Sequence, residues 1–237
     1  MKRATRYEEA SDESHREEVR SRPAGRAPRR CVGPRALPGQ GGQPPLVPPQ
    51  SHAFGKSFEQ WNVLYSEWAI ASGLGGATDL SETLGQVRFL PADLFDPSPE
   101  FHVTLPPGTP FVAPPFVVWG GRYDDPDVPD DNPADPILDD FFETAEIQTV
   151  LDGYVLLGGT GTELEPFRFG PVYFDEPIVF AEPQPSGPGL NSTAALFVVG
   201  IGSVYHPLPV GQHTLVTTVH SFFGDKQVTY HITVSPQ

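Results

Sequence analysis

The sequence lacks the features that usually mark an enzyme or a disulfide-bonded domain. It has one cysteine in 237 residues, so no disulfide can form within the chain and the fold must be held by its core. The patterns GxSxG, HExxH and CxxC and a phosphate-binding P-loop are all absent. These absences favour a protein without catalytic activity over any familiar class of enzyme.

Basic residues are scarce after the first fifty positions. Residues 51–237 contain five Lys and Arg but 24 Asp and Glu, which gives a net charge of −19. A protein that binds nucleic acid needs a basic surface that releases counterions from the phosphates. We therefore expect this part of the chain to bind neither nucleic acid nor an anionic membrane. No apolar run predicts a membrane span, and the expected partner is a protein or a glycan.

Residues 1–50 have a different composition. They contain ten Lys and Arg against six Asp and Glu, are rich in Pro and Gly, and show neither helical nor strand periodicity. We expect a disordered, solvated tail, with contact to a partner through its arginines as the alternative. The tail lacks the apolar core of a signal peptide, so the sequence leaves the location open, and the true start could lie downstream.

The 29 prolines and 24 glycines predict many short strands rather than long helices. One helix is nevertheless expected within residues 51–79, where Ser57 and Gln60 form a capping-box pattern. The apolar residues that follow recur at spacings of three and four: Phe58, Trp61, Leu64, Tyr65 and Trp68. This stripe predicts packing against the core. The alternative is a ligand that stacks on exposed tryptophans, with Trp61, Trp68 and Trp119 as candidates.

Residues 80–237 have the pattern of a β-sandwich. Asp152-Gly153 separates apolar runs at 147–151 and 154–157 and is the strongest hairpin signal in the chain. A second short helix is expected at 135–144, capped by Asp135 with Pro136 at its first position. Further strands are predicted at residues 86–90, 103–105, 116–119, 172–174, 178–180 and 194–205. The pattern predicts an all-β, two-sheet antiparallel sandwich, Ig-like or jelly-roll-like.

The final hairpin decides which side chains face the core. Gly224-Asp225 is the turn signal between residues 214 and 234, and a two-residue turn there places Val219 opposite Tyr230. The apolar face would then consist of Leu215, Val219, Val228, Tyr230, Ile232 and Val234. The opposite face would carry His220 and His231 as diagonal neighbours, turned toward water.

The segment PLPxGxHTL at residues 207–215, followed by TYxITV at 229–234, resembles the closing strands of bacterial Ig-like domains. It is also similar to uncharacterised secreted bacterial β-sandwich proteins. In those proteins, segments like residues 85–91 and 103–111 precede an Asp-Gly hairpin, which Asp152-Gly153 matches here. The resemblance covers residues 80–234. It implies a sandwich fold and an extracellular setting, and it implies no activity.

An acidic loop is the first candidate site. Residues 124–140 contain eight aspartates interrupted by four prolines. Ca²⁺ prefers several oxygen ligands supplied by one loop. The candidate Ca²⁺ ligands are Asp125, Asp127, Asp130 and Asp131. The loop lacks the glycine and the terminal glutamate of an EF-hand, and a solvated acidic loop is the alternative.

Two other groups could support chemistry. His220 and His231 would be close enough to share a metal ion in the expected register, with scattered surface histidines as the alternative. The other group consists of acidic residues near Arg168: Glu163, Glu165, Asp175 and Glu176. A glycosidase would need two such carboxyl groups facing each other across a cleft.

The sequence as a whole favours a non-enzymatic β-sandwich module with a binding or structural role at a cell surface or outside the cell. No cofactor is expected, apart from Ca²⁺ at the acidic loop. One alternative is a carbohydrate-active or metal-dependent hydrolase that uses the acidic residues. The other is a structural domain stabilised by Ca²⁺.

Overall fold

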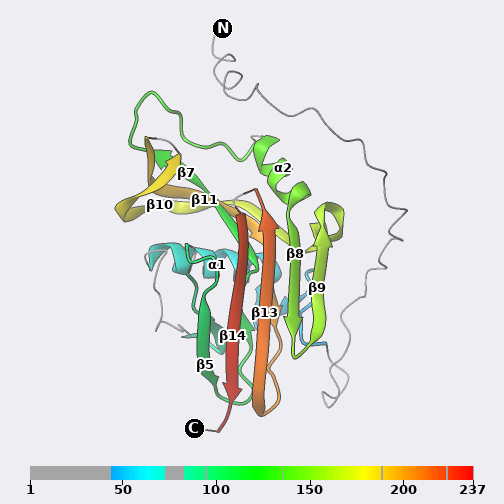
Figure 1. Ribbon diagram of the computed structural model, residues 1–237. Coiled ribbons are helices and arrows are strands. Elements are labelled where there is room, and N and C mark those ends of the chain that lie inside the picture. Colours follow the sequence, from blue (N-terminus) through cyan, green and yellow to red (C-terminus); the bar gives the residue numbers. More distant parts are fainter. Residues whose placement is uncertain are drawn as a thin grey trace, which may run out of the picture. The chain divides into compact units, whose positions relative to one another are not determined.

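The structure is a computed structural model that describes residues 44–72, 83–93, 95–134, 136–187, 189–222 and 224–236. Most of these residues belong to strands, and two short α-helices accompany them (Figure 1). The predicted all-β sandwich is confirmed. The tail prediction for residues 1–43 lies outside the described residues. None of the described helices combines the length and the apolar character needed to cross a membrane.

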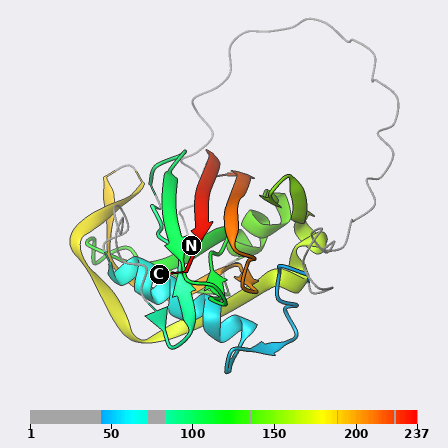
Figure 2. The same cartoon turned by 90° about the horizontal axis from the view of Figure 1, so that it is seen from below.

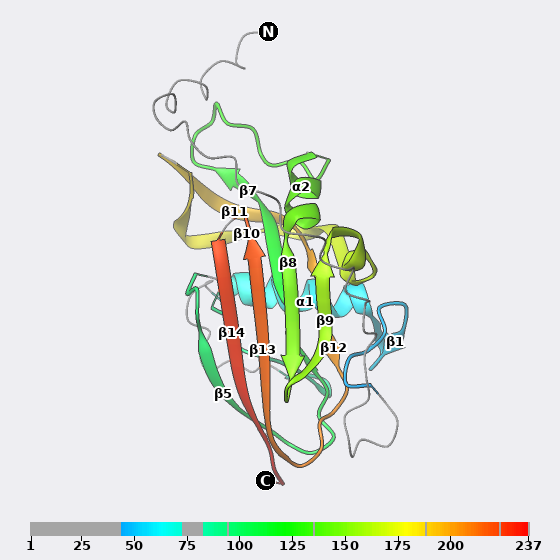
Figure 3. The same cartoon turned by 45° about the vertical axis from the view of Figure 1, so that its right-hand side comes forward.

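The larger sheet has five strands in the order β5-β14-β13-β8-β9 (Figure 3). The strands are β5 (Glu100–Leu105), β14 (Gly224–Val234), β13 (Gly211–Ser221), β8 (Glu146–Leu151) and β9 (Tyr154–Thr160). All neighbours are antiparallel except β5 and β14, which run parallel. The predicted hairpin at Asp152-Gly153 joins β8 to β9, and both turn residues have positive φ angles, as a type I′ turn requires.

A second sheet has three strands in the order β10-β11-β7. They are β10 (Arg168–Gly187), β11 (Leu190–Ile201) and β7 (Phe116–Tyr123). The two strands predicted at 172–174 and 178–180 are parts of the single strand β10. Its pairing with β11 is interrupted by register shifts, because β10 contains several prolines that lack the donor a regular ladder needs.

The remaining strands are short. A four-stranded sheet has the order β12-β6-β4-β3, from β12 (Val204–Tyr205), β6 (Phe111–Val112), β4 (Val87–Phe89) and β3 (Thr83–Leu84). A small hairpin pairs β1 (His52–Ala53) with β2 (Lys56–Ser57). Two 3₁₀ turns, η1 (Gly161–Glu163) and η2 (Glu165–Phe167), connect β9 to β10.

The predicted aromatic helix is α1 (Phe58–Ala71), and Ser57 and Gln60 cap it reciprocally as the sequence indicates. Its side chains enter two apolar clusters. Trp61 and Tyr65 pack with residues of the four-stranded sheet, whereas Ile70 packs with residues of β10 and β11. The helix lies against β10 (Figure 2). The second helix, α2 (Pro136–Thr144), also forms where predicted, although its expected cap Asp135 is outside the described residues.

The largest apolar cluster joins the inner face of the five-stranded sheet to β11. Leu46 also belongs to it and is only 3% exposed, and Val47 is buried in the cluster around α1. The composition assigns residues 44–50 to the tail, but the packed part of the chain includes them. Backbone hydrogen bonds also hold this segment, from the Val47 N–H to the carbonyl of Val204 and from the His206 N–H to the carbonyl of Pro45, both at 2.8 Å.

The final hairpin has the predicted faces but not the predicted register. Ser221 pairs with Gly224 and Val219 with Lys226, so the turn lies at residues 222–223 rather than at Gly224-Asp225. The register differs from the predicted one by an even number of residues, so the same side chains still face the core. Val228 is partly buried, and the other expected core residues are buried: Leu215, Val219, Tyr230, Ile232 and Val234. Gly224, with φ of +109°, lies just after the turn instead of within it.

Candidate functional site

The three tryptophans proposed as ligand contacts are mainly packing residues. Trp61 is 2% exposed and its indole N–H donates to the carbonyl of Ala53 over 2.8 Å. Trp68 is partly buried between Tyr65 and Phe89. Trp119 is also partly buried and contacts Phe180 edge to face. The structure thus supports the core interpretation for Trp61 and leaves Trp68 and Trp119 partly exposed.

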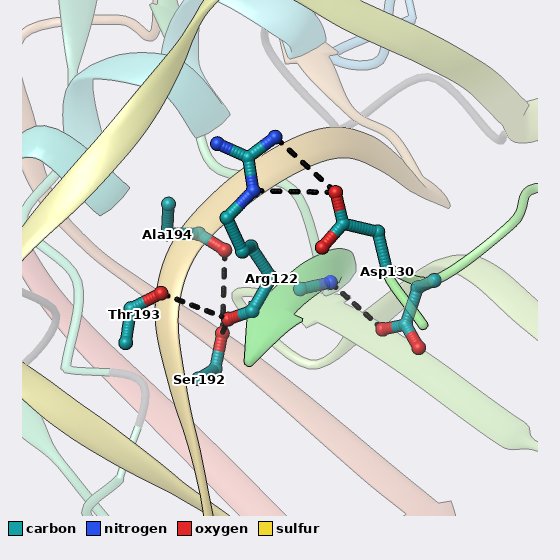
Figure 4. Close-up of polar contacts among 7 residues, drawn as sticks. Arg122, Asp130, Ser192, Thr193 and Ala194 are labelled. Atoms are coloured by element: carbon teal, nitrogen blue, oxygen red, sulfur yellow. Dashed lines mark hydrogen bonds and ion pairs between the residues drawn. The ribbon is translucent and has the colours of Figure 1, made fainter. Parts of the chain in front are cut away.

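The acidic loop is held by separate local contacts. Arg122 at the end of β7 donates from Nε and from a terminal nitrogen to Asp130 over 3.2 Å (Figure 4). Asp131 accepts from the backbone N–H of Gly121 at 2.7 Å and from the Tyr123 hydroxyl at 2.8 Å. Burial and this bond to Asp131 raise the pKa of Tyr123.

The other aspartates of the loop also have partners of their own. Asp124 accepts hydrogen bonds from the side chain and backbone of Asn191, which lower its pKa. Asp125 accepts from the backbone N–H of Asp127 within a tight turn. Among the described residues, no three of these carboxylates gather their oxygens within 4.8 Å. The four candidate Ca²⁺ ligands are therefore not brought together as a set.

The carboxylates near Arg168 do not face each other across a cleft. Glu163 and Glu165 lie in successive 3₁₀ turns rather than on one strand face. Glu163 accepts from the backbone N–H of Thr160, whereas Glu165 lies 3.8 Å from Arg168. Arg168 itself pairs with Asp139 at 2.8 Å and lies over the ring of Phe142. These contacts give Arg168 a structural role between β10 and α2.

Asp175 and Glu176 are exposed on β10. Two open hollows lie beside the β3–β4 turn. One, of about 270 Å³, lies between this turn and residues 106–109. The other, of about 520 Å³, lies between this turn and residues 54–56 of the β1–β2 hairpin. Neither hollow is lined by an acidic residue or a histidine. Neither of these two hollows therefore brings the carboxyl groups near Arg168 together.

The structure separates His220 from His231. In the observed register His231 of β14 pairs with Thr214 of β13. His220 of β13 pairs with Asp225 of β14. The Nδ1 atom of His220 lies 2.8 Å from Asp225 Oδ1, and this hydrogen bond and the negative charge raise the pKa of His220. The proposed metal pair is wrong, because its geometry depended on the incorrect turn.

His231 has a different neighbour. The parallel pairing of β5 with β14 places His102 directly beside it, and the two imidazole rings stack with centroids 4.7 Å apart and planes at 18°. Glu100 precedes His102 by two residues on β5, and its Oε1 contacts Nε2 of His231. One ligand atom from each of Glu100, His102 and His231 lies within 4.8 Å of the others, a grouping found nowhere else among the described residues.

Alternation along two strands produces this cluster. Phe101, Val103 and Leu105 turn into the core, so Glu100 and His102 face solvent. On β14, His231 lies between buried Tyr230 and Ile232. The cluster therefore stands on the outer face of the five-stranded sheet, on backbone that is fixed by the core beneath it.

The sequence contains a signal for this cluster that the turn-based register missed. The segments FHVTL at 101–105 and YHITV at 230–234 have the same order of side chains: aromatic, histidine, β-branched, threonine and aliphatic. The structure pairs them position by position in parallel. Two segments with identical alternation in the same direction suit neighbouring strands, since each would place its histidine on the same face.

Comparison of the chain with models of protein families, with characterised proteins and with solved structures found no match. Two features are prominent on the surface of the described residues: the Glu100–His102–His231 cluster and the edge strand β10 of the three-stranded sheet.

Proposed function

We propose that this chain is a non-enzymatic binding module that takes up an extended protein segment along β10. The observation that carries the proposal is the exposure of two large apolar side chains on this strand: Tyr173 is 60% exposed and Val179 is 76% exposed. A large apolar side chain that stays exposed can mark an interaction site. An Ig-like relationship and a place outside the cell belong to the same proposal and rest on the resemblance of the C-terminal strands.

The position of β10 favours a strand as the partner. Among the described strands β10 pairs only with β11, so one side of its backbone has no neighbouring strand. Such an edge can accept an extended peptide by continuing the sheet. Pro177 and Pro183 have no backbone N–H and cannot donate a hydrogen bond to a partner strand. Residues 178–182, which lie between them, retain their N–H groups. The available segment is short and lies around Val179.

The charges around this segment favour a basic partner. Asp175, Glu176 and Glu182 are exposed on the same strand, and residues 51–237 carry a net charge of −19. Opposite charge on the partner would speed its approach and select against acidic competitors. We call this surface the β10 strip, and it consists of Tyr173, Asp175, Glu176, Val179 and Glu182. Its expected ligand alternates apolar and basic side chains.

The proposal can be tested with a fluorescent synthetic peptide of alternating valine and lysine, measured by fluorescence anisotropy. We expect saturable binding that Val179→Ser weakens. The matched control is Val210→Ser, because Val210 is also an exposed valine, at 64%, and lies outside the strip. A peptide with glycine in place of valine keeps the charge and should bind more weakly.

Equal binding of the two peptides, or equal effects of the two serine substitutions, would show simple attraction to an acidic protein and contradict the proposal. Binding of soluble oligosaccharides without any peptide binding would contradict it as well. Loss of that sugar binding in Trp119→Ala would then favour the glycan alternative, since Trp119 is partly exposed.

A further inference from the structure

We propose that Glu100, His102 and His231 form a surface site for a divalent transition-metal ion such as Zn²⁺. The site is independent of the β10 strip. It arises because β5 and β14 run parallel and in register, so that His102 and His231 are direct neighbours. The carboxylate of Glu100 already contacts His231, and the two imidazole rings are stacked.

The distances suit a small ion after minor adjustment of the side chains. The three ligand atoms lie within 4.8 Å of one another. Zn²⁺ binds histidine nitrogen and carboxylate oxygen at about 2.0–2.2 Å, which in a tetrahedral site places the ligand atoms about 3.4 Å apart. Because Glu100 and His102 are exposed and His231 is partly exposed, rotation about the side-chain bonds can close this difference without moving the backbone.

The donor set decides which metal fits. Two imidazoles and one carboxylate suit Zn²⁺, Ni²⁺ or Cu²⁺, whereas Ca²⁺ and Mg²⁺ prefer oxygen ligands alone. Three protein ligands leave one position of a tetrahedral ion open to water or to a group from another molecule. The negative charge of the chain would raise the local concentration of any cation.

The rigidity of the support distinguishes this cluster from scattered surface histidines. Phe101 and Val103 flank His102 on β5, and Tyr230 and Ile232 flank His231 on β14, all with 7% exposure or less. Phe101 and Tyr230 also stack on each other beneath the two strands, with ring centroids 5.4 Å apart. The two histidines therefore cannot separate without disrupting the core, and a site on such a scaffold loses little freedom when it binds an ion.

The test is isothermal titration calorimetry of the full chain with ZnCl₂. We expect one saturable event that depends on the cluster, and His102→Ala, His231→Ala and Glu100→Gln should each reduce the affinity about tenfold or more. His220→Ala is the matched control, because His220 is an exposed histidine of the same sheet whose strand partners are Asp225 and Glu146 rather than another histidine. It should leave the affinity unchanged.

A second measurement keeps the test independent of folding. In spectra of protein with ¹³C-labelled histidine rings, Zn²⁺ should shift the signals of His102 and His231 and leave that of His220 in place. His15 and Cys31 lie outside the described residues, and any Zn²⁺ that they bind would be common to all variants. Equal affinities in the wild type and the three variants would overturn the proposal. So would displacement of Zn²⁺ by an equal concentration of Ca²⁺.

Discussion

At the level of single residues, two buried polar side chains, Asn62 and Ser203, link α1 to the segments around Ser203 and Ala113. Asn62 is fully buried, donates to the carbonyl of Phe58 and accepts from the backbone N–H of Ser203 at 3.0 Å. The Ser203 hydroxyl in turn donates to the carbonyl of Ala113. These bonds tie one helix to two segments far apart in the chain. Buried polar groups of this kind are costly to leave without partners.

His220 provides a residue-scale prediction about pH. Its pKa is raised by the hydrogen bond to Asp225 and by the charge of that carboxylate. A raised pKa in the folded state means that protonation stabilises the fold. This contribution is complete below the ordinary histidine pKa of about 6.5 and is lost as the pH rises through the higher folded value.

We expect Asp225→Asn to lower the pKa of His220 in an NMR titration. The stability advantage of the wild type over this variant should be larger below about pH 6.5 than at pH 8. The signals of the other histidines serve as internal controls. An unchanged titration of His220 in the variant would show that Asp225 is not its partner and would contradict the observed turn.

Some residues with a structural role were predictable from the sequence, and others were not, for a physical reason. Ser57 and Gln60 were predictable because a helix cap depends on residues three positions apart. Glu100 was not, because its role depends on a strand more than a hundred residues away. The sequence presents Asp130 and Asp131 as candidate Ca²⁺ ligands, whereas in the structure β7 supplies their partners through Arg122, Tyr123 and Gly121.

At the level of elements, the two hairpins show when a turn signal is sufficient. Asp152-Gly153 works because the turn needs two residues with positive φ and this pair adopts them readily. Gly224-Asp225 contains the same kinds of residue, but Asp225 bonds to His220 and Ser221 donates to the carbonyl of Gly224. These contacts close the hairpin two residues earlier on β13, so the faces were predictable and the pairing was not.

The pairing of β8 with β13 leads to a stability prediction. Thr149 and Thr217 are direct partners in these strands, and their hydroxyl oxygens lie 3.2 Å apart in the core. Each residue is at most 4% exposed. A single Thr→Val substitution removes one hydroxyl and leaves the other buried without this partner.

We expect Thr149→Val or Thr217→Val alone to reduce the free energy of unfolding by about 1–3 kcal/mol. The double variant should be closer to the wild type than the sum of the two single losses, because no hydroxyl remains unsatisfied. Urea denaturation of the four proteins measures this difference. Strictly additive losses would contradict the hydrogen bond and the register that produces it.

At the level of the whole molecule, long-range pairing decides where function can lie. The strand pattern predicted the all-β class and the capping box predicted α1, since these signals depend on local alternation and spacing. The parallel neighbours β5 and β14 bring residues 100–105 and 229–234 together, and local signals do not report such distant contacts. The Glu100–His102–His231 cluster exists only because of this pairing, as does its fixed position above the core.

The most direct test of this arrangement is a NOESY spectrum of protein with ¹³C-labelled histidine rings. The chain has seven histidines, so His→Gln variants can assign each ring signal. The structure predicts cross-peaks between the rings of His102 and His231, whose centroids are 4.7 Å apart, and none between His220 and His231. A cross-peak between His220 and His231, with none between His102 and His231, would contradict the parallel pairing of β5 and β14 and the metal site together.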